Sequence, residues 1–286
     1  MEPTKNNNVI LVPTDFSKIG DSAIEHAAGI AKILSCKVCI THVINKDTKS
    51  LLRKDKMGEV TVFQKLSMVV RDVEQKYKVK AEYIAREGSI FSTISEIAEE
   101  IKATMIVIGT HGKIGVQHLI GSYALKVITS SSVPVIVVQK RSFDKGYNDI
   151  VLPLDDSLES KQKLKWAIHI ARIFNSKIHI FAMKHNDELI SSKINNNLAQ
   201  IKSILTKNKI KHTVKISEKS GGNFAKQAIA YANSIRADLV VIMTNPEQLL
   251  PSFILGPWDE AIIFNAAQIP VLCVNPRDFN IIILGL

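Results

Sequence analysis

The sequence predicts an α/β protein made of two tandem, doubly wound domains, each with a five-stranded parallel sheet and helices on both faces. Three observations support this prediction. Segments in the two halves of the chain match in the same order, and short apolar runs alternate with amphipathic helical patterns. The chain also has 286 residues, of which 46% are hydrophobic and 22% charged, as expected for two globular domains with their own cores.

An internal repeat divides the chain. Four pairs of segments match in order: 9–17 with 149–157, 31–43 with 171–183, 102–109 with 236–243, and 133–138 with 269–274. In the first pair, Pro13 and Asp15 of VILVPTDFS fall 140 positions before Pro153 and Asp155 of DIVLPLDDS. Such self-similarity indicates tandem duplication. We expect domains at residues 1–140 and 147–277, joined near KRSFDKGYN, residues 140–148, where charges and glycine interrupt the apolar pattern.

Strands and helices alternate within the first repeat. The apolar run Val9–Val12 is typical of a buried strand. Between Ala23 and Leu34, apolar residues recur at spacings of three and four, which predicts an amphipathic helix. The remaining expected elements follow in chain order: strand Lys37–Val43, helix Glu59–Lys76, strand Val79–Ala85, helix Ser89–Ile101, strand Met105–Ile108, helix Ser122–Ser130 and strand Val135–Val138.

This alternation predicts Rossmann-like domains. Right-handed crossovers wind the helices onto both faces of a parallel sheet, and a ligand then binds at the carboxyl ends of the strands where the winding reverses. The final strands, Val135–Val138 and Val271–Val274, would be unpaired sheet edges, and such edges tend to pair with other chains and aggregate. We therefore expect the two edges to meet in an intramolecular pseudo-dimer, and two chains to pair further as a homodimer.

Charge and cysteine content limit the partners. The net charge of +10 is shared equally, because lysine and arginine minus aspartate and glutamate gives 19 − 14 in residues 1–140 and 18 − 13 in residues 141–286. An even excess favours a solvated basic surface over a nucleic-acid footprint. Three cysteines imply no disulfide framework and favour a cytoplasmic location. No apolar run approaches the length of a membrane span. The segment CKVC, Cys36–Cys39, has redox or metal spacing, but it enters a strand and no second ligand pair is present, so we expect no metal.

A glycine-rich loop suggests an anion site. Gly109 ends the fourth strand, Gly112 follows, and Gly121 with Ser122 opens the last helix. Glycine allows close backbone approach, and the free amides of a helix N-terminus attract a phosphate. Ser122 is expected to cap that helix and to donate its hydroxyl to a phosphate oxygen. A glycine-rich turn before a helix is, however, more often only a turn.

Two other strand ends converge on the same crevice. Asp15 follows the first strand beside Pro13 and Thr14, and Val43 ends the second strand. The Asp15 carboxylate suits hydrogen bonds from a ribose or a base, and Val43 offers an apolar wall for a flat ring. Asp15 is equally suited to cap the first helix, a position for which Ser17 competes.

These motifs resemble the universal stress protein family in its tandem form, with a fold similar to that of adenine nucleotide alpha hydrolases. The resemblance covers nearly the whole chain and implies an ATP site in the first repeat, with Mg²⁺ accompanying the nucleotide. Pro13, Thr14, Asp15 and Val43 would hold the nucleoside. The residues implied for the triphosphate are Gly109, His111, Gly112, Gly121, Ser122 and Tyr123.

The first repeat departs from the family pattern in two places. Eight residues, Lys113–Ile120, separate the second and third glycines where nine are usual, and Tyr123 replaces a small apolar residue. The second repeat departs further, because Pro246 and Pro257 remove backbone donors and Met243 and Trp258 add bulk. We expect no nucleotide binding of the family's kind there, and a scaffold role instead.

Three functions remain open on this basis. The first is a nucleotide-binding regulatory protein in which ATP occupancy biases shape or assembly. The second is an interaction protein of the same fold with an empty site, favoured by the short loop and Tyr123. The third is a genuine ATPase or nucleotidyl enzyme, for which the sequence offers only His111 as a candidate. Slow ATP hydrolysis is also compatible with the first function if His111 or Asp15 positions a water. No nucleophile and base stand together near the loop, so no fast enzyme is expected.

Overall fold

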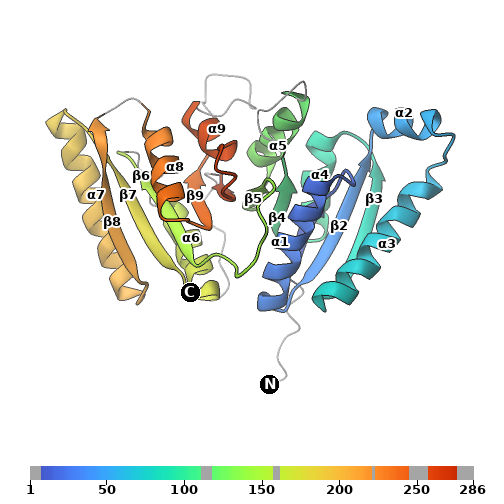
Figure 1. Ribbon diagram of the computed structural model, residues 1–286, viewed down its shortest axis with the longest axis horizontal. Coiled ribbons are helices and arrows are strands. Elements are labelled where there is room, and N and C mark those ends of the chain that lie inside the picture. The colour runs from blue at the N-terminus through green and yellow to red at the C-terminus, as the bar shows by residue number, and fades with distance from the viewer. Residues whose placement is uncertain (1–7, 111–117, 157–161, 221–222, 245–256, 276–286) are drawn as a thin grey trace.

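The computed structural model describes residues 8–110, 118–156, 162–220, 223–244 and 257–275 (Figure 1). The side chains of residues 118–123, 162, 257 and 258 lie outside the described part. Within these ranges no helix is long and apolar enough to cross a membrane. At one end of the molecule lie β8 (His212–Ser220) and α7 (Glu188–Lys207), and at the other lie β3 (Ala81–Glu87), α2 (Lys46–Lys54) and α3 (Val60–Tyr77) (Figure 1). Helices α5 (His118–Ser130) and α9 (Pro257–Ile263) lie near the middle.

Strands and helices alternate through both halves. The elements of the N-terminal half are β1 (Val9–Pro13), α1 (Lys18–Leu34), β2 (Lys37–Ile44), α2 (Lys46–Lys54), α3 (Val60–Tyr77), β3 (Ala81–Glu87), α4 (Ile90–Glu100), β4 (Ala103–Gly109), α5 (His118–Ser130) and β5 (Val135–Val138). Those of the C-terminal half are β6 (Asp149–Leu154), α6 (Gln162–Phe174), β7 (Lys177–Lys184), α7 (Glu188–Lys207), β8 (His212–Ser220), α8 (Phe224–Ser234), β9 (Leu239–Met243), α9 (Pro257–Ile263) and β10 (Val271–Val274).

The strands form one continuous ten-stranded sheet in the order β3-β2-β1-β4-β5-β10-β9-β6-β7-β8. Strands within each half pair in parallel, as predicted, and each half has the doubly wound order in which the chain reverses direction beside its first strand. The prediction that the two final strands meet is confirmed, because β5 and β10 pair antiparallel with Leu272 opposite Ile136. Both residues are fully buried, so this seam belongs to the core.

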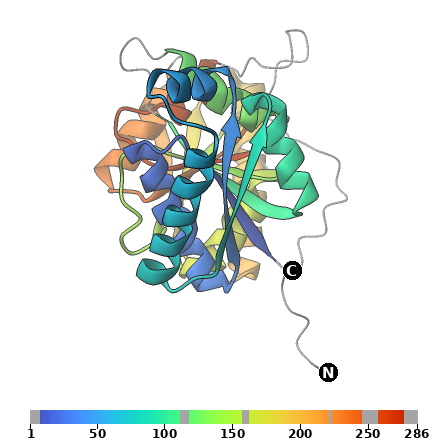
Figure 2. The same cartoon turned by 90° about the vertical axis from the view of Figure 1, so that its right-hand side faces the viewer.

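Helices cover both faces of each half of the sheet. α1 packs against α3 on one face of the N-terminal half, and α4 packs against α5 on the other. Figure 2 shows α3 and α4 on opposite sides of β2 and β3. β1 and β4 are almost wholly apolar and buried, as expected for central parallel strands. The predicted α/β class and doubly wound architecture are therefore confirmed.

Two boundaries near the crevice differ from the sequence prediction. Helix α2, Lys46–Lys54, was not predicted. The last helix of the first half begins at His118 and not at Ser122, so the capping role predicted for Ser122 is wrong. A glycine inside a helix costs only about 1 kcal/mol relative to alanine, and Gly121 therefore does not prevent the helix from starting earlier.

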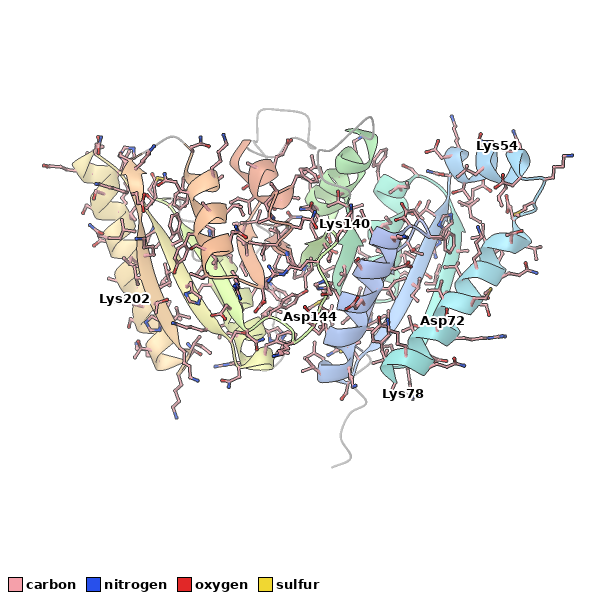
Figure 3. All side chains as sticks on the ribbon, in the orientation of Figure 1. Lys54, Asp72, Lys78, Lys140, Asp144 and Lys202 are labelled. Atoms are coloured by element: carbon pink, nitrogen blue, oxygen red, sulfur yellow. The ribbon has the colours of Figure 1, made fainter. Side chains whose placement is uncertain are left out.

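The segment that connects the halves is packed against α1. Tyr147 is 1% exposed, and its hydroxyl lies 2.8 Å from Nδ1 of His26 in α1. Phe143 packs edge-on against the rings of both residues. Asp144, labelled in Figure 3, lies in the same segment between the two halves. Tyr147 thus anchors the connection in the hydrophobic core, and Phe143 packs against that core.

Candidate functional site

A cavity of about 390 Å³ opens in the N-terminal half at the carboxyl ends of β1, β2 and β4. It lies where the strand order reverses, because β2 follows on one side of β1 and β4 lies on the other. Its wall is completed by the starts of α1 and α4, by α2 and by one residue of α5. The lining is Pro13, Thr14, Asp15, Ser17, Ile19, Gly20, Thr41, His42, Val43, Asn45, Asp47, Thr48, Leu51, Ile90, Ile94, Ile108, Gly109 and Ala124.

Half of the predicted site residues line this cavity. They come from three separate strand ends and are Pro13, Thr14, Asp15, Val43 and Gly109. His111 and Gly112 lie outside the described residues. Gly121, Ser122 and Tyr123 lie in the second turn of α5, and nothing is described of their side chains. The next residue of that helix with a described side chain, Ala124, lines the cavity.

The turn after β1 holds Asp15 at the cavity by short local hydrogen bonds. The Thr14 hydroxyl accepts from the Phe16 amide at 3.0 Å, and Asp15 Oδ1 accepts from the Ser17 amide at 3.0 Å. Ser17 is the N-cap of α1, since its hydroxyl accepts from the Gly20 amide at 3.2 Å. The competition for the cap is therefore decided in favour of Ser17, and the Asp15 side chain remains exposed in the crevice.

His42, near the end of β2, forms hydrogen bonds to the turn after β1 and to α2. Its Nδ1 donates to the Thr14 carbonyl at 2.8 Å, and its Nε2 accepts from the Thr48 hydroxyl at 3.0 Å. The Phe16 ring stacks on the imidazole at 4.8 Å. Burial lowers the pKa of His42, with the Thr14 carbonyl opposing that shift. His42 is thus neutral, and its two hydrogen bonds connect the turn after β1 to α2.

Helix α2 supplies site residues that the sequence analysis missed. Asn45, its N-cap, accepts from the Thr48 amide at 2.8 Å, and both residues line the cavity together with Asp47 and Leu51. No residue of α2 is buried, so the segment carries no core-facing apolar stripe to predict it. The available signal was the capping residue Asn45 followed by an acidic first turn and a basic last turn.

Gly109 permits close packing between β4 and α1. A Cβ at this position would lie 2.7 Å from the Ile19 carbonyl oxygen and 2.9 Å from its Cγ2. Either distance is too short for a side chain to fit without movement of α1. The absence of a side chain therefore has a packing cause, and the close approach of a phosphate to Gly109 stays a prediction.

The next residue, Thr110, carries an unsatisfied hydroxyl. Thr110 is fully buried, and its Oγ1 is the one buried side-chain oxygen or nitrogen that lacks a partner within the described ranges. Its counterpart after β9, Thr244, donates to the Val274 carbonyl and bonds the side chain of Asn275. Buried hydroxyls are nearly always hydrogen-bonded. The Thr110 hydroxyl at the end of β4 can therefore still accept or donate a hydrogen bond, whereas the Thr244 hydroxyl after β9 already donates one.

The equivalent crevice of the C-terminal half is built from different residues. Met243 ends β9 where Gly109 ends β4, and Pro257 is the first residue of α9. Pro246 lies outside the described residues. Asp155 keeps the place of Asp15 directly after the first strand of its half.

Parallel strands with a reversal of strand order, and a crevice at their carboxyl ends beside that reversal, define a doubly wound α/β protein. The family comparison agrees with this class. The model of the Universal stress protein family matches residues 6–139 and again residues 146–275. The chain therefore belongs to the Universal stress protein family and contains two copies of its domain.

Individual relatives match single repeats. Universal stress protein MJ0531 of Methanocaldococcus jannaschii is 33% identical over 138 residues, covering 46% of this chain and 81% of the relative. Universal stress protein MJ0577 of the same organism is 28% identical over 156 residues, covering 46% and 95%. A crystal structure of a universal stress protein from Archaeoglobus fulgidus matches 94% of this chain and 99% of its own with a TM-score of 0.75, and at 20% identity it supports the tandem fold.

Proposed function

We propose that this protein is a regulatory binding protein whose N-terminal half binds ATP together with Mg²⁺. Occupancy of the site would bias the shape of the chain or its assembly with a second copy. The observation that carries the proposal is the cavity at the strand reversal, which brings together Pro13, Thr14, Asp15, Val43 and Gly109 from three strand ends. Those are the positions that the family resemblance implies for the nucleoside and for the start of the phosphate loop.

The dimensions and chemistry of the cavity suit a nucleoside. Its volume of about 390 Å³ lies within the range of small-molecule sites. Val43, Ile94 and Ile108 offer an apolar wall to a flat base. The exposed Asp15 carboxylate has one oxygen engaged by the Ser17 amide, which leaves the other available for a ribose hydroxyl.

The phosphate end is supported by α5. Its first amides have no partners inside the helix, and the positive end of its dipole attracts anions. Ala124 of this helix lines the cavity. The Thr110 hydroxyl, which has no partner in the described part of the chain, lies one residue beyond the end of β4. Asp15 and Asp47 both line the cavity, and carboxylates together with phosphate oxygens are the ligands that Mg²⁺ prefers.

A binding role is favoured over catalysis by the state of His42. It is the one imidazole among the described lining residues, and both of its nitrogens are engaged, with the Thr14 carbonyl and the Thr48 hydroxyl. Burial lowers its pKa, so it is neutral and committed to a structural role. The described part of the lining therefore offers no free imidazole to act as a general base, and His111 lies outside it.

Thermal unfolding with and without MgATP tests the proposal. A ligand at a hundred times its Kd stabilises a protein by about 2.7 kcal/mol, so the midpoint should rise measurably. Asp15→Asn keeps the oxygen that accepts from the Ser17 amide but removes the charge, and we expect affinity to fall at least about tenfold. Asp72→Asn, on the exposed surface of α3, is the matched control and should bind as the wild type does.

Each contrary outcome identifies one of the other functions. No stabilisation by MgATP at any concentration would mean that the site is empty and the protein a scaffold. Steady phosphate release that Asp15→Asn abolishes would mean an ATPase. Stabilisation without turnover is the result that the proposal predicts.

A further inference from the structure

Lys163, in the first turn of α6, is the one lysine that is buried within the described residues. It is 5% exposed. Lysine is almost never buried unless its ammonium group is paired, because desolvation of a charge is costly. The burial of Lys163 therefore calls for a partner inside the C-terminal half.

The repeat shows which part of the C-terminal half Lys163 reaches. At the offset of 140 positions its counterpart is Ala23, a fully buried residue of α1. Ala23 lies on the same helical face as Ile19 and Gly20, which line the N-terminal cavity one turn earlier. Helical side chains lean toward the N-terminus, and a lysine side chain spans roughly one turn of about 5.4 Å. The ammonium group of Lys163 is thereby directed to the place that the cavity occupies in the N-terminal half.

Two carboxylates interact with that ammonium group. Asp155 and Asp259 both act on Lys163 electrostatically, and they oppose the lowering of its pKa that burial causes. Asp155 is the counterpart of Asp15, which lines the N-terminal cavity. Asp259 stands three residues after Gly256, as Ala124 stands three residues after Gly121, and Ala124 lines that cavity as well. By the repeat correspondence, the two carboxylates stand at positions that line the crevice in the N-terminal half, and Lys163 stands one helical turn further along.

We propose that the ammonium group of Lys163 is a built-in cation that fills the C-terminal crevice and, through Asp155 and Asp259, ties α6, the end of β6 and α9 together. The Lys163 side chain then fills the C-terminal crevice in place of a ligand, and the crevice has no room for a nucleotide. That a nucleotide occupies the corresponding N-terminal crevice rests on the proposed function, whereas the filling of the C-terminal crevice by Lys163 does not.

Chemical rescue tests this proposal without any nucleotide. Lys163→Ala removes three carbons and the ammonium group, which propylammonium can replace. Both tryptophans of the chain, Trp166 and Trp258, lie in the C-terminal half, so tryptophan fluorescence reports unfolding of that half. We expect Lys163→Ala to lower the unfolding midpoint by at least about 5 °C and propylammonium chloride to restore much of the loss. The neutral 1-propanol should restore little, and the wild type should respond to neither.

Two further variants make every outcome decisive. Lys165→Ala, which removes an exposed lysine of the same helix, should melt as the wild type does. If Lys163→Ala does not fold, Lys163→Met keeps the length of the side chain without its charge, and it should melt below the wild type. The proposal is overturned if Lys163→Met is as stable as the wild type, or if 1-propanol rescues Lys163→Ala as well as propylammonium does.

Discussion

The two halves of the molecule share one topology and differ at the crevice. Both have the same strand order around their first strand, yet one presents an open cavity and the other buries a lysine, Lys163, in the first turn of α6. Gly109 corresponds to Met243, and Ala23 corresponds to Lys163. The doubly wound fold therefore provides a place for a ligand in each half, and a few side chains decide whether the place stays open.

The seam between the halves has kept the symmetry that the crevices have lost. Gln139, after β5, donates from Nε2 to the Asn265 carbonyl near the end of α9 at 3.0 Å. Asn275, after β10, donates reciprocally to the Ile128 and Ser131 carbonyls at the end of α5. Each half thus supplies hydrogen bonds to the last helix of the other. The two halves therefore differ more at the crevices than at the seam.

The largest expected effect comes from breaking the aromatic contacts by which the connection packs on both halves. Tyr147 contacts His26 of α1 in the N-terminal half and packs edge-on against Phe174 of α6 in the C-terminal half. Tyr147→Ala should cost about 3–5 kcal/mol in the free energy of unfolding, as for other large buried rings. Tyr147→Phe keeps the ring and should cost only about 1–2 kcal/mol, through the lost hydroxyl. Urea denaturation of both variants measures the difference, and equal losses would contradict this account.

The second prediction concerns the pH dependence that His26 confers. Its Nε2 lies 2.9 Å from the Arg141 carbonyl and must carry the proton, so Nδ1 accepts from the Tyr147 hydroxyl. Burial lowers the pKa of His26 from 6.5 to about 4. Between these values the unfolded chain binds more protons than the folded one, so stability present above pH 6.5 is lost as the pH falls toward 4.

The expected loss over that interval is about 3 kcal/mol for this group. Urea denaturation of the wild type and of His26→Gln at several pH values measures it. The glutamine variant should be less stable at neutral pH and should lack this part of the pH dependence. Parallel stability curves for the two proteins would show that the pKa of His26 is not lowered.

The third and smallest effect contrasts two matched threonines. Thr244→Val removes a hydroxyl that bonds the Val274 carbonyl, and it should cost about 1 kcal/mol. Thr110→Val removes a hydroxyl without a partner in the described part of the chain, so it should be neutral or stabilising. Thermal unfolding of the two variants without ligand tests this contrast. A Thr110→Val variant that loses as much stability as Thr244→Val would contradict it.

The sequence predicted features that depend on local pattern and on repetition. Apolar runs located strands such as β5, which matches its predicted bounds, and the duplication predicted that β5 and β10 meet. Helix α2 was missed because none of its residues is buried, although its residues line the cavity. Lys163 was missed because a lysine near a helix start is normally solvated, and its burial depends on tertiary packing that no local sequence pattern shows.

The central claim is that each chain has one open crevice and one that its own lysine fills. The most direct test is calorimetric titration of the full-length wild-type protein with MgATP, which counts the nucleotides bound per chain. The account predicts one nucleotide per chain, with binding weakened by Asp15→Asn. A stoichiometry of two would show that the C-terminal crevice is open, and no binding at all would show that the N-terminal one is not a nucleotide site.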